Sequence, residues 1–289
     1  KPEIAIITNI SGAHFKNFNT LKDIAKAKSE IIDNIIDSGK IILNKDDKFF
    51  NFLSNKALKK EIKVISFSSK KKADIYLSGV KKIKSIYKLK IIIKKNIFYF
   101  YTKIATNNFI SNFLACIATL NTLNLNIKNL EKKFMSFSLP SGRGDIKIIK
   151  KFNKKFKLID ESYNASPLSM KSAIENMNNY KKNKNAQKII FLGDMLELGK
   201  KSKKFHKKLS TIINKSNVDK VYVYGKDIKK TFYSLYANKK GKIFNNLTEA
   251  YEHFSKIVHN NDLVMIKGSN ATGLNRFSKK IKKGQISAL

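Results

Sequence analysis

The chain has 289 residues, of which 42% are hydrophobic, and this is enough for a buried core and, on length alone, for two domains. Its net charge of +38 would suit a nucleic-acid-binding protein, but only Arg143 and Arg276 are arginines among the 59 basic residues, and the lysines are dispersed. Because base readout and phosphate clamps favour arginine, we interpret the charge as a lysine-rich solvated surface and expect no nucleic-acid partner.

The single cysteine, Cys116, excludes a disulfide within the chain and favours a reducing compartment. No apolar run of about 18 residues is present, and no signal peptide is recognisable. We therefore expect a cytoplasmic, monomeric protein without a membrane span. Residue 1 is Lys and a strand follows almost at once, which we interpret as a fragment whose beginning is missing.

The first half of the chain alternates strands and helices. Strands are predicted at 4–10, 40–44 and 63–68. Helices are predicted at 20–36, where Thr20 and Asp23 form a capping box, and at 46–59. Residues 73–105 show a long alternating pattern that predicts antiparallel strands, and helices follow at 107–123 and 127–136.

The segment LPSGRGD (139–145) is the best boundary because it contains Pro140, Gly142 and Gly144, so we predict domains at 1–141 and 142–289. Beyond it, strands are predicted at 156–162, 188–193, 220–224 and 262–267, and helices at 167–180, 202–215, 228–236 and 247–258. This alternation predicts an α/β protein whose second domain is a doubly wound, Rossmann-like parallel sheet.

Polar stretches follow four strands of the second half. They are DESYNAS after Leu158-Ile159, GDMLELG after KIIFL, GKD after VYVY and KGSN after LVMI. Because ligands of open α/β sheets bind outside the carboxyl ends of the strands, we predict a ligand site at this edge. The stretch LIDESYNASP also has a simpler interpretation, in which Ser166 or Asn164 caps the helix that begins at Pro167.

Two residues of the first half could take part in site chemistry. His14 lies in the loop TNISGAH, where a neutral imidazole could bind a metal ion or be an ordinary surface residue. Lys28 falls inside the apolar arc of its helix, between Ile24 and Ile35, at 100° per residue. Either this lysine snorkels to water from the buried face, or it performs chemistry beside His14.

Two further residues carry groups that suit a nucleotide. Asn112, early in an apolar helix, could pair with an adenine edge or form a hydrogen bond at the helix start. Arg143, between two glycines, suits a phosphate or is a solvated hinge residue. The sequence contains no G-x-x-x-x-G-K-[ST], so a phosphate-binding loop of that type is absent from it.

These motifs together resemble the Mur ligase family. TNISGAHFKNFNTLKDIAKAKSEI is similar to the central-domain signature of its MurF type, and LIDESYNASPLSM, FLGDMLELG, His206 and MIKGSN resemble the carboxy-terminal domain of that type in the same order. The resemblance implies part of a central ATP-binding domain followed by a Rossmann-like domain. It also implies ATP-dependent addition of D-Ala-D-Ala to UDP-N-acetylmuramoyl-tripeptide through an acyl phosphate, in peptidoglycan precursor synthesis.

The resemblance implies roles for particular residues as well. His14 would bind a magnesium ion, and a carbamylated Lys28 would help the metal hold the phosphate. Asn112 would contact adenine and Arg143 the ATP phosphates. The remaining residues would lie beside the ribose (Glu161, with Asp160 behind it), line the interdomain cleft (Tyr163 and Asn164) or lie near the incoming dipeptide (Asp194, Glu197, Lys267, Gly268 and Ser269).

The sequence departs from the family pattern in places: Glu161 stands where a second Asp is common, and Asn108-Phe109 stand where His-Asn is usual. The family's UDP-binding domain, phosphate-binding loop and a metal-binding Glu would precede residue 1, so we expect the chain alone to be inactive. The alternatives are a sister ligase of the folylpolyglutamate or diaminopimelate-adding type, a basic nucleic-acid-binding module, and a non-catalytic remnant.

Overall fold

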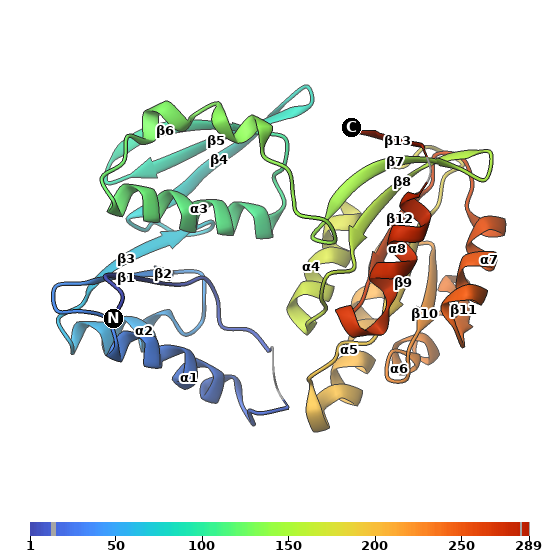
Figure 1. Cartoon of the computed structure of the whole chain (residues 1–289), viewed down its shortest axis with the longest axis horizontal. Helices are drawn as coiled ribbons and strands as arrows, with labels where there is room; N and C mark the ends of the chain where they lie inside the picture. Colours follow the sequence, from blue (N-terminus) through green and yellow to red (C-terminus); the bar gives the residue numbers. More distant parts are fainter. Residues whose placement is uncertain (13–15, 284, 289) are drawn as a thin grey trace. The chain divides into compact units, whose positions relative to one another are not determined.

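The computed structural model describes residues 1–12, 16–283 and 285–288, which form two compact units (Figure 1). Residues 1–11 and 18–137 form unit 1. Residues 138–288 form unit 2, which also includes Gly12, Lys16 and Asn17. Each unit is a mixed sheet with helices packed against it, so the predicted α/β class is confirmed.

Unit 1 is a six-stranded sheet whose strands follow one another in sequence order. Strands β1 to β4 are parallel, and β4 to β6 are antiparallel, as the change of pattern near residue 73 predicted. The strands are β1 (Ile4–Ile7), β2 (Lys40–Asn44), β3 (Lys63–Ser68), β4 (Ile75–Ile83), β5 (Ile86–Ile93) and β6 (Asn96–Thr102). The helices are α1 (Leu21–Asp33), α2 (Phe50–Leu58) and α3 (Asn107–Thr122).

Local sequence explains where α1 begins. Thr20 Oγ1 accepts a hydrogen bond from Asp23 N at 3.2 Å, and Asp23 Oδ2 accepts one from Thr20 N at 2.8 Å, which is the predicted capping box. The predicted α-helix at 127–136 is wrong, because this segment forms two 3-10 helices, η1 (Ile127–Leu130) and η2 (Lys133–Ser136). Between them, the Glu131 carbonyl oxygen accepts a hydrogen bond from Tyr101 N of β6 at 3.0 Å. This oxygen is therefore not available for the hydrogen bonds of an α-helix.

Unit 2 is a seven-stranded sheet in the order β11-β10-β9-β12-β8-β7-β13. Its parallel strands are β8 (Lys154–Glu161), β9 (Lys188–Gly193), β10 (Lys220–Tyr224), β11 (Lys240–Phe244) and β12 (Leu263–Lys267); β7 (Asp145–Lys151) and β13 (Gln285–Ala288) pair antiparallel. The helices are α4 (Pro167–Asn178), α5 (Ser202–Asn214), α6 (Lys229–Tyr233), α7 (Leu247–Ile257) and α8 (Leu274–Lys282), with 3-10 helices η3 (Gly199–Lys201), η4 (Ala237–Lys239) and η5 (Asn270–Thr272).

Four strands and α-helices of unit 2 were not predicted from sequence: β7, β11, α8 and β13. The β7–β8 hairpin turns at Phe152-Asn153, which both have φ +55°, the backbone of a two-residue hairpin turn without its usual glycine. Strand β11 contains Gly241, which looks like a strand breaker. A Cβ there would lie 2.5 Å from the Tyr222 ring, so the glycine is required by close packing.

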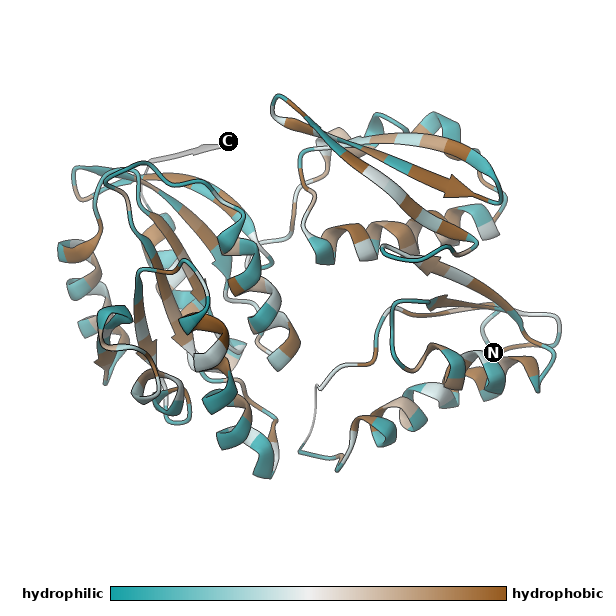
Figure 2. Cartoon of the chain, turned by 180° about the vertical axis from the view of Figure 1, so that it is seen from behind, coloured by the Kyte–Doolittle hydropathy of each residue, from teal (hydrophilic) through white to brown (hydrophobic). Residues whose placement is uncertain are grey.

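Helices cover both faces of the parallel strands, as a doubly wound sheet requires. Phe191 of β9 and Ile266 of β12 point into a core cluster with Phe254 of α7 and Phe277 of α8. The alternate residues on the same strands, Ile190 and Met265 among them, are also buried. Helices α4, α5 and α6 pack against one another in sequence. Figure 2 shows the central strands as largely hydrophobic, with hydrophilic stretches along the helices.

Replacing Phe191 by Ala should destabilise unit 2 by about 3–5 kcal/mol, because its ring is 2% exposed and packs against Tyr222, Phe244 and Phe277. Urea unfolding followed by near-ultraviolet circular dichroism measures the loss. Tyr236→Ala, also in unit 2, is the matched control, because that side chain is 62% exposed. Equal losses in the two variants would contradict this account of the core.

Candidate functional site

The carboxyl ends of four strands lie level in unit 2. Glu161 of β8 pairs with Lys267 of β12, Lys267 pairs with Leu192 of β9, and Gly193 pairs with Tyr224 of β10. The four polar stretches that follow these strands therefore leave the sheet at one edge, as the sequence predicted.

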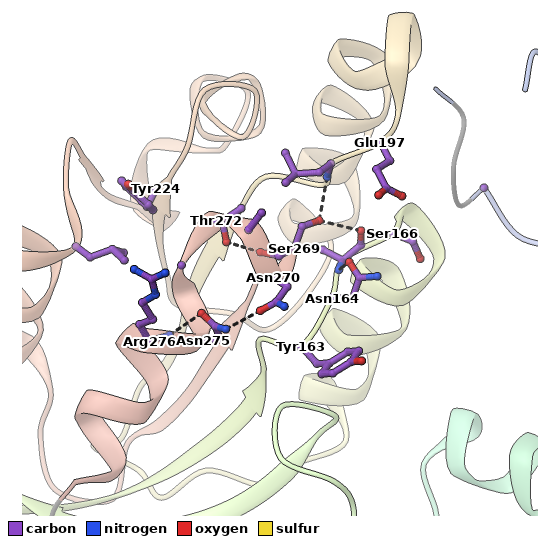
Figure 3. A pocket seen from close by; sticks show the side chains of 16 residues that line it. Tyr163, Asn164, Ser166, Glu197, Tyr224, Ser269, Asn270, Thr272, Asn275 and Arg276 are labelled. Carbon is purple, nitrogen blue, oxygen red and sulfur yellow. Dashed lines mark hydrogen bonds between the residues drawn. The ribbon is translucent and has the colours of Figure 1, made fainter. Parts of the chain in front are cut away.

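A pocket of about 780 Å³ opens among these loops (Figure 3). The loop after β8 contributes Tyr163 to Ser166, the loop after β9 contributes Leu196 and Glu197, and β10 contributes Tyr224. The longest contribution comes from Ser269 to Gly273, after β12, with Asn275 and Arg276 of α8. Five of the predicted residues lie in or beside this pocket: Tyr163, Asn164, Glu197, Gly268 and Ser269. Asn275 and Arg276 were missed because α8 was not predicted, and Asn270 and Thr272, in η5, were not singled out within or after the KGSN stretch.

Lys267 is a buried cation that ties two of these loops together. Its side chain is 2% exposed, and its Nζ lies 2.9 Å from the Asn164 carbonyl oxygen and 3.3 Å from Glu161 Oε2. Burial lowers the pKa of Lys267, while the charge of Glu161 and its hydrogen bond to Lys267 oppose that effect. Lys267 thus fixes the loop that carries Glu161 and Asn164.

Arg143 lies in the same part of unit 2. Its guanidinium carbon is 4.0 Å from the centre of the Tyr163 ring, a cation–π contact. The loop comes this close because Gly142 and Gly144 have φ +82° and +96°, which favour glycine. A Cβ on Gly142 would lie 3.0 Å from Tyr163 N, and one on Gly144 would lie 3.0 Å from Glu161 Oε1.

Asp160 is buried and is held by a cation that sequence reasoning missed. Its carboxylate accepts hydrogen bonds from Lys282 Nζ and from Ser162 N, the latter at 3.1 Å. Lys282 also donates to Asp145 Oδ2 at 2.9 Å and lies 3.4 Å from Ser141 Oγ. We call Asp145, Asp160 and Lys282 the acidic clasp. It anchors both ends of the loop that carries Arg143, so Asp160 acts by positioning.

The acidic clasp shifts the pKa of both of its best-buried groups. Burial alone raises the pKa of Asp160, but the hydrogen bonds from Lys282 and Ser162 outweigh it and leave the pKa below its ordinary value of 3.8. Burial alone lowers the pKa of Lys282, but the hydrogen bonds to Asp160 and Asp145 outweigh it and leave the pKa above 10.5. Both pKa shifts widen the pH range in which Asp160 and Lys282 are charged, as an ion pair requires.

The carboxylate of Asp194 is occupied by backbone N–H donors. Its carboxylate accepts hydrogen bonds from the backbone N of Lys226, Asp227 and Ile228 at 2.9, 3.0 and 2.7 Å. These bonds join the loop after β9 to the loop after β10, and a Cβ on Gly225 would lie 2.5 Å from Asp194 Oδ1. The geometry therefore leaves Asp194 little capacity for a ligand.

His206, on α5, is fully buried and also holds the loop after β9 in place. Its Nε2 accepts from Met195 N at 3.0 Å and its Nδ1 lies 2.9 Å from the Ser202 carbonyl oxygen, the contacts of a neutral ring protonated on Nδ1. Both ring nitrogens are engaged inside the fold.

Gly268 and Ser269 bring the loops after β9 and β12 into close contact beside the pocket. A Cβ on Gly268 would lie 3.1 Å from the Gly193 Cα and 2.9 Å from Thr272 Oγ1, so the ends of β9 and β12 can approach only because both residues are glycines. Ser269 is 4% exposed; its Oγ accepts from Leu196 N at 2.9 Å and donates to the Ala165 carbonyl oxygen at 3.3 Å. Glu197 is exposed beside the pocket and has φ +62°, a conformation that costs an L residue about 1 kcal/mol.

Within LIDESYNASP, one residue caps a helix and others line the pocket. Ser166 caps α4: its Oγ accepts from Ser169 N at 3.3 Å, and Pro167 occupies the first helical turn. Asn164 is not the cap and instead lines the pocket. The stretch therefore starts a helix and supplies a loop that lines the pocket.

In unit 1 the placement of Lys28 on the buried face of α1 is wrong. Lys28 is exposed, and its Nζ donates to the Asn9 carbonyl oxygen at 3.0 Å. The buried face of α1 is formed by Ile24, Ala25, Ser29 and Ile32, so Lys28 lies at its margin and its long chain reaches out to the backbone that follows β1.

Three side chains fix the backbone at 8–10. Besides Lys28 on Asn9, Asn44 Nδ2 donates to the Thr8 carbonyl oxygen at 3.0 Å, and Asp47 Oδ2 accepts from Ile10 N at 2.6 Å. Neither Asn44 nor Asp47 was recognised from sequence. His14 follows this segment but lies outside the described residues.

Asn112 is exposed on α3. It does not bond the helix start, because Thr106 caps α3 by accepting from Phe109 N at 3.4 Å. Its neighbour Ser111 lies 3.5 Å from Asn44 Nδ2, which places this turn of α3 beside the carboxyl ends of β1 and β2. This position is compatible with a contact to a ligand of unit 1.

Among the residues that the structure describes, no group of three or more His, Cys, Asp or Glu side chains could hold a metal ion. The described residues therefore do not fit a magnesium site by themselves. The described helices also include none that is both long and apolar enough to cross a membrane.

Comparison with known families defines the class of protein. The Mur ligase middle domain matches residues 1–120, and the domain described as "Mur ligase, glutamate ligase domain" matches residues 146–270. The chain belongs to the Mur ligase family.

Within that family the chain is similar to the D-alanyl-D-alanine-adding type. It is 32% identical over 282 residues to the UDP-N-acetylmuramoyl-tripeptide–D-alanyl-D-alanine ligase of Rickettsia prowazekii (strain Madrid E), covering 96% of this chain and 60% of the relative. It is 31% identical over 266 residues to the enzyme of that name from Buchnera aphidicola subsp. Baizongia pistaciae (strain Bp), covering 92% and 55%. The chain thus spans little more than half the length of these relatives.

A solved structure agrees in fold. The crystal structure of MurF ligase from Thermotoga maritima in complex with ADP has a TM-score of 0.82 at 22% sequence identity, covering 98% of this chain and 62% of that one. The partial central domain and Rossmann-like second domain that the resemblance implied are therefore confirmed as folds.

Replacing Lys282 by Met should destabilise unit 2 by about 3–5 kcal/mol at neutral pH, because it leaves the buried Asp160 unpaired. The lowered pKa of Asp160 means that this stabilisation is present above pH 3.8 and is lost as the pH falls through the folded-state pKa. The raised pKa of Lys282 means that it is present below pH 10.5 and is lost as the pH rises beyond it. Urea unfolding across pH measures both arms; Lys279→Met is the control, and a difference that stays constant into acid would contradict the assignment.

Replacing Asp47 by Ala should speed amide hydrogen exchange at Ile10 by about tenfold or more, because a charge-assisted acceptor is lost. The Phe49 amide, which donates to Asp47 Oδ1 at 2.8 Å, should behave in the same way. Exchange followed by nuclear magnetic resonance measures both sites. Asp37→Ala, an exposed change in the same unit, should leave them unchanged, and unaltered exchange in Asp47→Ala would contradict the anchoring.

Proposed function

We propose that this chain is part of an ATP-dependent ligase that adds D-Ala-D-Ala to UDP-N-acetylmuramoyl-tripeptide in peptidoglycan precursor synthesis, a cytoplasmic reaction. The observation that carries the proposal is the similarity over almost the whole chain to relatives that bear this enzyme's name. The pocket at the level strand ends of unit 2 supports it, because it offers a built, polar site where such folds bind ligands.

In the proposed reaction, a carboxylate oxygen of the tripeptide attacks the γ-phosphorus of ATP and ADP leaves. The amine nitrogen of D-Ala-D-Ala then attacks the acyl carbon, the nitrogen loses a proton, and phosphate leaves as the peptide bond forms. Catalysis of this kind depends on positioning and on cations around the transferred phosphoryl group.

The residues of unit 2 divide into contacts and supports. We assign Arg143 to the ATP phosphates and Glu161 to the ribose, with Tyr163 and Asn164 beside them. Asp160 supports this group through the acidic clasp, and Lys267 supports it by fixing Glu161. Glu197, Gly268 and Ser269 belong to the dipeptide side, and Asp194 supports that side by joining two loops.

In unit 1 we assign Asn112 to adenine and Lys28, as its carbamate, to the phosphoryl site with His14. The exposed position of Lys28 supports this, because carbon dioxide can reach its amine. A magnesium ion belongs to the proposal, but its ligands would include residues outside the described set, so no step is assigned to it.

The test measures phosphate release from ATP by the chain together with its native flanking sequence, in the presence of UDP-N-acetylmuramoyl-tripeptide. Release should require D-Ala-D-Ala, and Lys28→Ala should reduce it by about a hundredfold or more, as loss of a group at the transferred phosphoryl does. Lys22→Ala, on the outer face of α1, should keep the rate. Release that instead requires glutamate or diaminopimelate would make the protein a sister ligase.

A further inference from the structure

The pocket of unit 2 carries one charge of each sign among its described lining residues. The positive group is Arg276, in the first turn of α8, and the negative group is Glu197. The other polar lining residues are neutral amides and hydroxyls: Tyr163, Asn164, Ser166, Tyr224, Ser269, Asn270, Thr272 and Asn275. Figure 3 shows Arg276 and Glu197 on opposite sides of the pocket. A ligand that fills it therefore meets a cation at one side and an anion at the other.

Arginine is a rare choice in this chain. Only two of its 59 basic residues are arginines, and both lie at the carboxyl edge of this one sheet. Arg143 comes just before β7, whose Asp145 pairs with Asp160 near the end of β8, and Arg276 follows the loop after β12. Since a charge alone could be supplied by lysine, arginine at this place indicates a partner that takes two parallel hydrogen bonds, such as a carboxylate or a phosphate.

The charge pattern favours a zwitterion over a phosphate. A di- or triphosphate would meet a single cation here and would be repelled by Glu197. A small dipeptide has one negative and one positive end, and neutral amides and hydroxyls suit the peptide group between them. Because Arg276 is exposed, its guanidinium can rotate onto a ligand without giving up a buried partner.

We propose that Arg276 binds the terminal carboxylate of the incoming dipeptide and so selects amines that carry a free carboxyl terminus. The dipeptide then lies with its amino end directed away from Arg276, towards the side of the pocket that Glu197 lines. The identity of the dipeptide as D-Ala-D-Ala rests on the proposed function, whereas the arrangement of charges belongs to unit 2 alone.

The test is a calorimetric titration of the 289-residue chain with D-Ala-D-Ala, with its carboxy-terminal amide D-Ala-D-alaninamide, and with inorganic phosphate. The amide should bind the unaltered chain about tenfold or more weakly than the free dipeptide, because the charged pair is lost. Arg276→Gln should weaken D-Ala-D-Ala by the same factor and leave the amide unchanged, and Arg276→Lys should fall between. Lys279→Gln, which removes a charge from the next turn of α8 outside the pocket, should bind like the unaltered chain.

The outcomes separate this inference from the proposed function. Equal affinities for the dipeptide and its amide, no binding of either, or tighter binding of phosphate that Arg276→Gln abolishes would each overturn the carboxylate assignment. Each would leave the ligase proposal to the phosphate-release assay, which uses a different readout. Conversely, an Arg276-dependent preference for the free dipeptide would stand even if no ligation were found.

Discussion

In unit 2, strands β8, β12, β9 and β10 are hydrogen-bonded in a register that brings Glu161, Lys267, Gly193 and Tyr224 to the same level. The polar character of this edge depends on that register. A shift of one residue in β12 would turn Lys267 to the opposite face of the sheet and break its bonds to Glu161 and Asn164. The same shift would separate Gly268 from Gly193, whose contact allows the two loops to meet.

The buried lysines change the interpretation of the chain's composition. Most of its cations are solvated, but Lys188, Lys267 and Lys282 are at most 8% exposed. Each has oxygen partners: Lys188 Nζ donates to the Met177 carbonyl oxygen at 2.6 Å and to Asn217 Oδ1 at 2.9 Å, at the end of α4. A buried ammonium is tolerated when its bonds are satisfied, and it is costly to leave unpaired. Composition alone could not separate these three from the solvated remainder.

The sequence predicted much of the fold because its strands are short apolar runs between turn signals, and the edge of the sheet at which the loops would meet follows from parallel topology. It did not predict β7, because a segment with three lysines among seven residues looks like surface, or α8, whose start at Gly273 has no side-chain cap. That omission also hid Lys282 and the pocket role of Arg276.

The orientation of Lys28 was wrong because a helical wheel locates the Cα, whereas a long side chain can reach beyond the arc. Which carboxylates would be saturated by backbone N–H groups, as Asp194 is, depends on the meeting of distant loops and has no local signal.

The acidic clasp has a consequence for the order of assembly during synthesis. Lys282 closes on Asp145 and Asp160 across 137 and 122 residues of chain. A ribosome would release the glycine-flanked Arg143 loop long before the ammonium of Lys282. Until α8 emerged, the loop would be held by nearby hydrogen bonds, such as those from Gly142 N to Asp145 Oδ1 and from Gly144 N to the Asp160 carbonyl oxygen. Chains that terminate before Lys282 would leave the carboxylates of Asp145 and Asp160 without their cation. The cation that neutralises both carboxylates therefore reaches them only in a chain translated through α8.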